Sequence, residues 1–167
     1  MSKKAHELST EDDELVSRVL DLLKARLQAN PYGLDDAFAQ EIRSLSAGLR
    51  AMAATHHLDV SLTMDDIGWH FLNFGHPTHV EETELGLREL GLAGVAAMFH
   101  EAYQLMQPHL SEIRRPGGDY YAVMERSGAM KRIDELTDQA RVAIGEQGIY
   151  RHWAAYARPH PEKVFAA

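Results

Sequence analysis

The sequence predicts an all-α fold, a single compact domain that covers residues 9–167 and contains about six to eight helices. Apolar residues recur three and four positions apart along most of the chain, which is the period of an amphipathic helix. Acidic residues, prolines and glycines mark the starts and ends of these segments. No segment shows the strict alternation of apolar and polar residues that is typical of a strand. A chain of 167 residues can bury a substantial core within one domain.

The N-terminal third predicts a flexible tail over residues 1–8 and then two helices. The first helix begins at Ser9 or Thr10, either of which can cap it, and ends at Asn30-Pro31. The second helix is expected over about residues 34–55, because a narrow apolar stripe is formed by Phe38, Ile42, Leu45, Leu49 and Met52. A short link joins the two, so we expect an antiparallel hairpin, although a coiled-coil dimer would give the same stripe. A loop is expected next, at His56-His57.

The stretch from residue 62 to residue 106 is rich in aromatic residues and predicts three helices. Thr63, with Asp66 three positions later, resembles a capping arrangement for the first of these helices, which ends at Gly75. Thr78 and Glu81 have the spacing of a capping box for the second, which ends at Gly91. The third is the most apolar and is closed by Pro108.

The C-terminal third has weaker signals at first and then two clear helices. Pro116-Gly117-Gly118 predicts a turn, and Asp119 can cap the segment that follows it. Helices are expected over about residues 129–144 and 146–157, each with an apolar face. Val164-Phe165 are expected to fold back onto the core.

Composition excludes several classes of function. The chain has no cysteine, which excludes disulfides, thiolate nucleophiles and cysteine-ligated metal centres. A formal charge of −8 argues against direct binding to nucleic acid and suits a basic partner. No apolar run is long enough for a membrane helix and no signal peptide precedes the first helix, so we expect a cytoplasmic protein that does not bind membranes. Protonation of all ten histidines would change the charge from −8 to +2, so an acidic surface should weaken toward pH 5–6.

Histidines and carboxylates raise the alternative of a metal-dependent hydrolase built around His70, His76, His79 and Glu82. The pattern fits poorly, because His76 and His79 flank a proline and a helix start, and no His-Glu-x-x-His motif places two imidazoles one turn apart. Nucleophile elbows and glycine-rich phosphate loops are also absent from the sequence. We therefore expect no enzymatic activity, no cofactor and no metal.

An acidic surface is the remaining candidate site. Carboxylates spaced along a surface can present a pattern of negative charge to lysine and arginine on a partner protein. The acidic groups nearest the glycine- and proline-rich junctions are predicted to form this surface, namely Asp65, Asp66, Glu81, Glu82, Glu84 and Glu89. The expected function is binding to a basic protein, such as a DNA-binding regulator, and an immunity-type inhibitor of a toxin would use the same chemistry.

Three segments carry a resemblance to a known family: IGWHFLNFG at 67–75, LGLRELGLAGVAAMFHEAY at 85–103, and IDELTDQ at 133–139 together with HWAAYARPHPEKVF at 152–165. In these segments the chain resembles a family of small all-helical bacterial proteins, a domain of unknown function that includes an acidic DNA mimic. The resemblance implies an all-α fold without enzymatic activity, and carboxylates that imitate DNA phosphates. This chain has Asp65-Asp66 where the family often has an Asn-Gly-Gly turn, and its charge of −8 is mild for a mimic.

Overall fold

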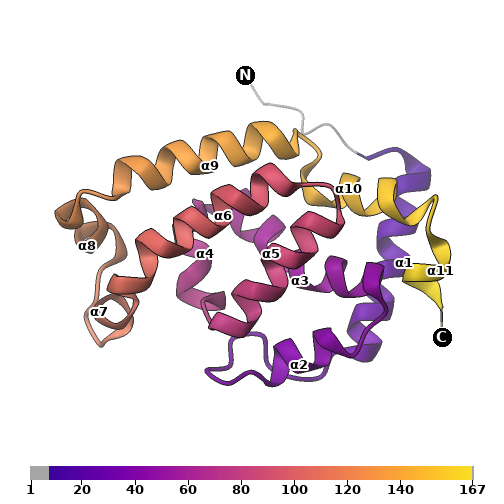
Figure 1. Ribbon diagram of the computed structural model, residues 1–167, viewed down its shortest axis with the longest axis horizontal. Helices are drawn as coiled ribbons and strands as arrows, with labels where there is room; N and C mark the ends of the chain where they lie inside the picture. Colours follow the sequence, from indigo (N-terminus) through magenta and orange to yellow (C-terminus); the bar gives the residue numbers. More distant parts are fainter. Residues whose placement is uncertain (1–7, 167) are drawn as a thin grey trace.

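The computed structural model describes residues 8–166, and these residues form helices and connecting turns without any strand (Figure 1). The all-α class is confirmed. The predicted tail lies outside the described residues, except for residue 8. One short 3₁₀ turn covers Gln107–His109, and the α-helices are α1 (Thr10–Arg26), α2 (Ala37–Arg43), α3 (Ala47–Met64), α4 (Ile67–Phe74), α5 (Pro77–Glu89), α6 (Ala93–Met106), α7 (Leu110–Arg114), α8 (Tyr120–Ser127), α9 (Met130–Ile144), α10 (Gly148–Ala157) and α11 (Pro161–Phe165).

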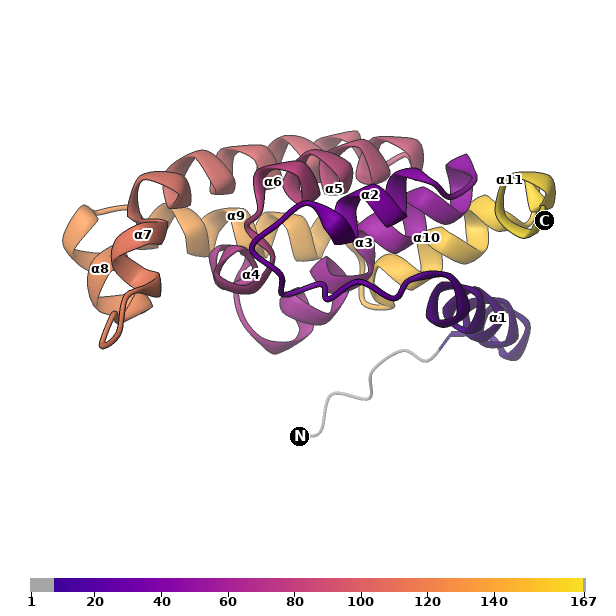
Figure 2. The same cartoon turned by 90° about the horizontal axis from the view of Figure 1, so that it is seen from below.

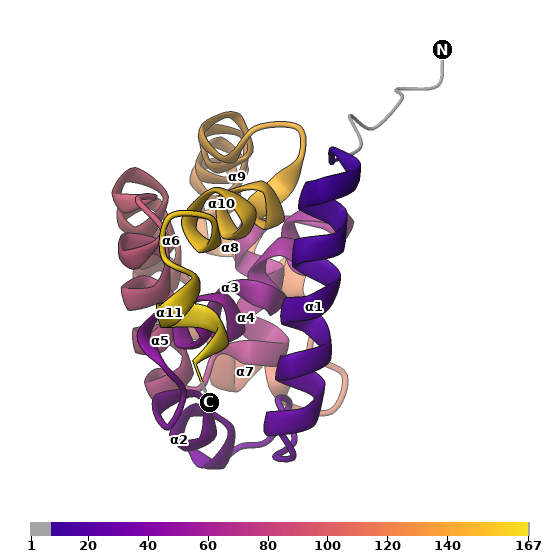
Figure 3. The same ribbon diagram turned by 90° about the vertical axis from the view of Figure 1, so that its right-hand side faces the viewer.

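Helix α3 is the centre of the bundle. It packs against α1, α2, α4, α5, α10 and α11, and most of its side chains are buried. Figures 2 and 3 show α5 and α6 on one side of α3 and α1 on the other. Small residues allow the closest of these contacts, because Gly86 of α5 lies directly over Ala51 of α3. A hydrophobic core therefore surrounds one axial helix on nearly all sides.

Helices α5, α6 and α9 form the outer layer of the bundle. Gly91, with a φ of +78°, makes the turn that lets α6 run back along α5. Helix α9 then packs along α6, as Figure 1 shows at the top of the view. The short helices α7 and α8 close one end of the molecule, and α10 and α11 lie at the other end near α1. The predicted fold-back is confirmed, because Val164 of α11 is fully buried against α3.

The single helix predicted over residues 34–55 is wrong. The chain breaks at Ser44–Ser46, where the Ser44 hydroxyl donates to the carbonyl of Glu41 and Ser46 has an extended backbone. Helix α3 then continues to Met64, so His56-His57 lie inside a helix and not in a loop. The apolar stripe is compatible with one helix or two, because its residues face the core on both sides of the break.

The predicted hairpin of the first two helices is also wrong. Helix α1 packs mainly on α10 and α3, and a linker of turns and bends over residues 27–36 separates it from α2. The Glu41 carboxylate fixes this linker by accepting hydrogen bonds from the backbone N–H groups of Gln28 and Ala29, each at 2.8 Å. A linker with its own anchor allows α1 to reach the far end of the bundle.

Capping was predicted correctly at Ser9 and Asp119, whose side chains accept from backbone N–H groups in the first turns of α1 and α8. Two other capping predictions were wrong. Asp66 caps α4 by accepting from the N–H of Trp69 at 2.7 Å, whereas Thr63 belongs to α3. Helix α5 starts one residue earlier than Thr78, because proline at the first helical position needs no hydrogen-bond partner for its nitrogen.

Candidate functional site

The six predicted partner-binding carboxylates do not form one surface. Asp65 and Asp66 lie at the junction of α3 and α4, and the four glutamates lie on α5. The two groups have different neighbours and different roles, so we describe them separately. Within residues 8–166, no helix combines the length and apolarity required to cross a membrane.

The aspartate pair holds helices together. Asp66 is buried, and beyond capping α4 it accepts a hydrogen bond from the Tyr120 hydroxyl at 2.7 Å. Burial raises the pKa of the Asp66 carboxyl, although hydrogen bonds from Tyr120 and Trp69 oppose the rise. Asp65 accepts from the Tyr121 hydroxyl at 2.5 Å. Both carboxylates thus tie the start of α4 to α8, which leaves Asp66 inaccessible to a partner protein.

Glu82 is the centre of an internal ion-pair network. Its side chain is 1% exposed and lies between two arginines, with Arg43 Nε at 2.6 Å and Arg50 Nε and Nη2 at 2.7 and 2.9 Å. Burial alone would raise the pKa of Glu82, but the hydrogen bonds from Arg50 and Arg43 outweigh it and lower this pKa. The network ties α5 to α2 and to α3. The two arginine side chains, each about one-third exposed, connect this network to the surface.

The other three glutamates of α5 lie closer to the surface and are also paired. Glu81 is mostly exposed and accepts from Arg43 Nη2 at 2.8 Å. Glu84 accepts from His100 Nδ1 at 2.7 Å. Glu89 accepts from the hydroxyl of Tyr156 and lies 4.0 Å from Lys163 Nζ. Pairs of this kind are weak in water, so a partner cation can replace the internal one.

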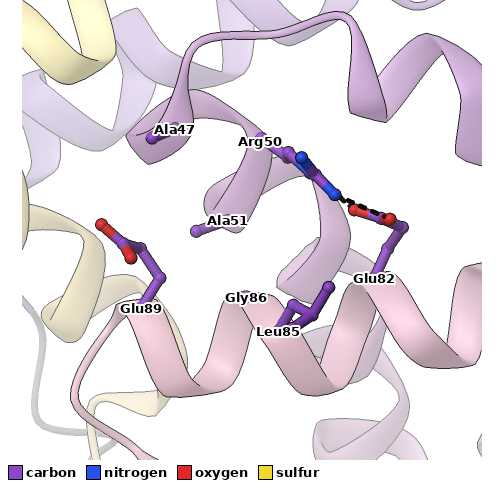
Figure 4. Close-up of a pocket in the computed structure, with 7 residues that line it drawn as sticks. All are labelled: Ala47, Arg50, Ala51, Glu82, Leu85, Gly86 and Glu89. Carbon is purple, nitrogen blue, oxygen red and sulfur yellow. Dashed lines mark hydrogen bonds and ion pairs between the residues drawn. The ribbon is translucent and has the colours of Figure 1, made fainter.

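A groove of about 240 Å³ runs between α3 and α5 (Figure 4). Its floor consists of small residues, because Ala47 and Ala51 of α3 face Gly86 of α5. The Arg50–Glu82 pair lies at one end and Glu89 at the other, with Leu85 on the rim between them. Leu85 is 48% exposed and lies on the rim of the groove, between charged side chains. We refer to Ala47, Arg50, Ala51, Glu82, Leu85, Gly86 and Glu89 as the α3–α5 groove.

The sequence predicted a role for four glutamates of α5, but it did not predict the groove beside them. The exposure of Leu85 could have been predicted from the sequence, because Leu85 lies off the buried stripe formed by Val80, Thr83 and Leu87. Arg50 had no such signal. It is 32 residues from Glu82 along the chain, so only the packing of α5 on α3 brings the two together.

The proposed hydrolase site is not assembled. His70 and His79 are buried, and Glu82 is already occupied by two arginines. In the described part of the chain, no group of three or more His, Asp or Glu side chains is arranged to hold a metal ion. The accessible chemistry along α5 is ion pairing and apolar contact.

Comparisons with protein-family models, with curated proteins and with solved structures found no match to this chain. The resemblance to a family that includes a DNA mimic therefore stays a prediction.

Proposed function

We propose that this chain is a non-enzymatic binding protein that presents the α3–α5 groove and the carboxylates of α5 to a basic segment of a partner protein, such as a DNA-binding regulator. The observation that carries the proposal is Leu85, an exposed leucine between Glu81 and Glu89 on the rim of a groove with an apolar floor. An apolar anchor surrounded by charged groups is the usual composition of a protein-binding surface.

Charge supports a basic partner. The molecule carries −8, and Glu81 and Glu89 are the reachable carboxylates on either side of Leu85. A lysine or arginine of the partner would displace Arg43 from Glu81, or Lys163 from Glu89, while an aliphatic side chain covers Leu85. Each partner cation replaces a cation that is already paired with Glu81 or Glu89, so binding changes the partners of these carboxylates and not their charge balance. Salt should therefore weaken this binding less than it weakens a protein–DNA complex.

Binding can be tested by replacing an apolar and an acidic side chain of α5 with basic ones. We expect the double variant Leu85→Arg, Glu89→Lys to lose affinity for a captured basic partner by at least about tenfold, because anchor and carboxylate are removed together. The matched control is Val142→Arg, Asp138→Lys on α9, which makes the same kinds of change at two well-exposed positions. Affinity is measured with purified partner by titration calorimetry, with and without duplex DNA as competitor.

Equal affinities of the two double variants would contradict this proposal. Competition by duplex DNA would identify the partner as a DNA-binding protein, as the DNA-mimic resemblance implies. Competition by the substrate of a toxin would instead assign the chain to immunity-type inhibitors, with the same groove in use.

A further inference from the structure

Three imidazoles, of which His70 and His79 are buried and His57 is partly exposed, gather between α3, α4 and α5. His57 of α3, His70 of α4 and His79 of α5 pack around Phe74, with ring centroids at 4.4, 5.1 and 6.0 Å from the Phe74 ring. The His57 and His79 rings are 6.1 Å apart. His70 is 1% exposed and His79 is 3% exposed. Three consecutive helices thus meet at one aromatic centre, and each contributes one histidine.

Each ring has a nitrogen that no protein group satisfies. Among the described residues, His57 Nδ1, His70 Nε2 and His79 Nε2 are buried without a hydrogen-bond partner. The other nitrogen of His70 lies 2.9 Å from the Ser61 hydroxyl, which itself donates to the carbonyl of His57. Ser61 then accepts from His70 Nδ1–H, so Nε2 carries a bare lone pair. A neutral imidazole tolerates this surrounding, whereas an imidazolium would bury a charged N–H with nothing to accept it.

We propose that His57, His70 and His79 form an acid-sensitive switch, in which protonation separates α4 and its junction with α5 from the rest of the bundle. Phe74 is the last residue of α4, and all three rings contact it. The loop before α2 lies against it, where the exposed Tyr32 ring is tilted relative to the Phe74 ring with the centroids 5.1 Å apart. Helix α4 also packs on α6 and α9, and the N–H of Ile67 at its start donates to Thr137 Oγ1 of α9, so opening must begin at the Phe74 end of α4.

The acidic group that acts on the cluster is Glu82, and two arginines already pair with it. From α5, Glu82 faces His79 but is held by Arg43 and Arg50, and His76 adds a further imidazole at the start of the same helix. From α3, His56 adjoins His57 and bonds to the Tyr150 hydroxyl of α10.

The other helices around the cluster bring cations or apolar rings. Lys24 of α1 lines the groove that His56 and His57 also line. Arg114 of α7 donates to the carbonyl of Phe71 at the end of α4. Helix α2 contributes Phe38 and α6 contributes Phe99. Protonation of His57 and His79 would therefore place two like charges on rings whose centroids are 6.1 Å apart, and the facing carboxylate of Glu82 is already paired.

The direction of the pH dependence follows from linkage. Burial lowers the pKa of His57 to about 3 and that of His79 to about 4, and it lowers the pKa of His70 well below its usual 6.5. In the opened state the rings regain ordinary values, so that state binds more protons below pH 6.5. The stability of the closed state is complete above pH 6.5 and is lost as the pH falls. Each ring contributes about a tenfold change in the open-to-closed ratio per pH unit, and three rings about a thousandfold.

The test is hydrogen exchange of the peptide that covers residues 65–80, measured at pH 7.5, 6.0 and 5.0 and corrected for intrinsic exchange rates. We expect protection of α4 to fall steeply below pH 6.5, while α9 remains protected. His70→Gln should reduce the change in the open-to-closed ratio of α4 by about tenfold per pH unit, because one titrating ring is removed. His160→Gln, at an exposed ring near the C-terminus, should leave the slope unchanged.

An NMR pH titration of the histidine rings in the wild-type protein provides a readout that does not depend on the folding of a variant. The three cluster rings should remain neutral in the closed state at about pH 5.5. Flat protection of α4 between pH 7.5 and 5.0 would overturn the proposal. It would also be overturned by equal slopes for wild type and His70→Gln, or by titration of the three cluster rings near 6.5 in the closed state.

Discussion

At the scale of single residues, Glu82 decides how α5 is attached. A buried carboxylate with two arginines is stable only as a complete set, because removing the anion leaves two cations facing each other. The sequence could not indicate this role. Arg43 and Arg50 lie 39 and 32 residues away, and glutamate at an exposed helix position would look the same. Of the six carboxylates predicted for a partner, Glu82 and Asp66 therefore act inside the molecule.

Replacement of Glu82 by alanine should destabilise the fold by about 2 kcal/mol, less than for a fully buried pair because water reaches both arginines. Urea unfolding at pH 7 measures the change in the free energy of unfolding. Glu81→Gln is the control, since Glu81 shares Arg43 but is mostly exposed, and it should change stability by less than about 0.5 kcal/mol. Equal effects of the two substitutions would show that the network does not anchor α5.

At the scale of elements, the close approach of α5 to α3 creates the groove. A methyl group on Gly86 would lie 2.9 Å from the carbonyl oxygen of Ala51 and 3.2 Å from its Cα, so backbone and not a flexible side chain blocks it. Gly86→Ala should therefore move α5 outward and cost about 1–3 kcal/mol in unfolding free energy.

Gly94→Ala in α6 is the matched control, because a methyl group there meets no atom within 4 Å. It should be neutral or stabilising by up to about 1 kcal/mol through helix propensity. Thermal unfolding followed by circular dichroism compares the two variants. A stable Gly86→Ala protein that still binds partner with wild-type affinity would mean that the groove is not the binding surface.

Most helices were predictable, because their signals are local. The ends of α4 at Gly75 and of α6 near Pro108, and the caps at Ser9 and Asp119, follow from residue types within a few positions. The break at Ser44–Ser46 and the path of α1 were not predictable, because they depend on contacts with distant helices. The groove and the histidine cluster share this origin, since each needs three-dimensional packing to bring separated residues together.

At the scale of the whole molecule, two effects of acid should be separable. Protonation of histidines outside the cluster would reduce the net negative charge, which should weaken binding to a basic partner gradually as the pH falls. Opening at the buried histidines should instead be cooperative and should appear without any partner. Salt distinguishes them further, because it screens a surface field but has little effect on a buried charge.

We propose that a partner covers α5 and the α3–α5 groove. Hydrogen exchange with and without a bound basic partner at pH 7.5 tests this claim most directly. We predict added protection in two peptides, one covering residues 47–51 and one covering residues 81–89, with no change in α9. Protection that appears on α9 around Val142, which is 84% exposed, while α5 exchanges as in the free protein would contradict it.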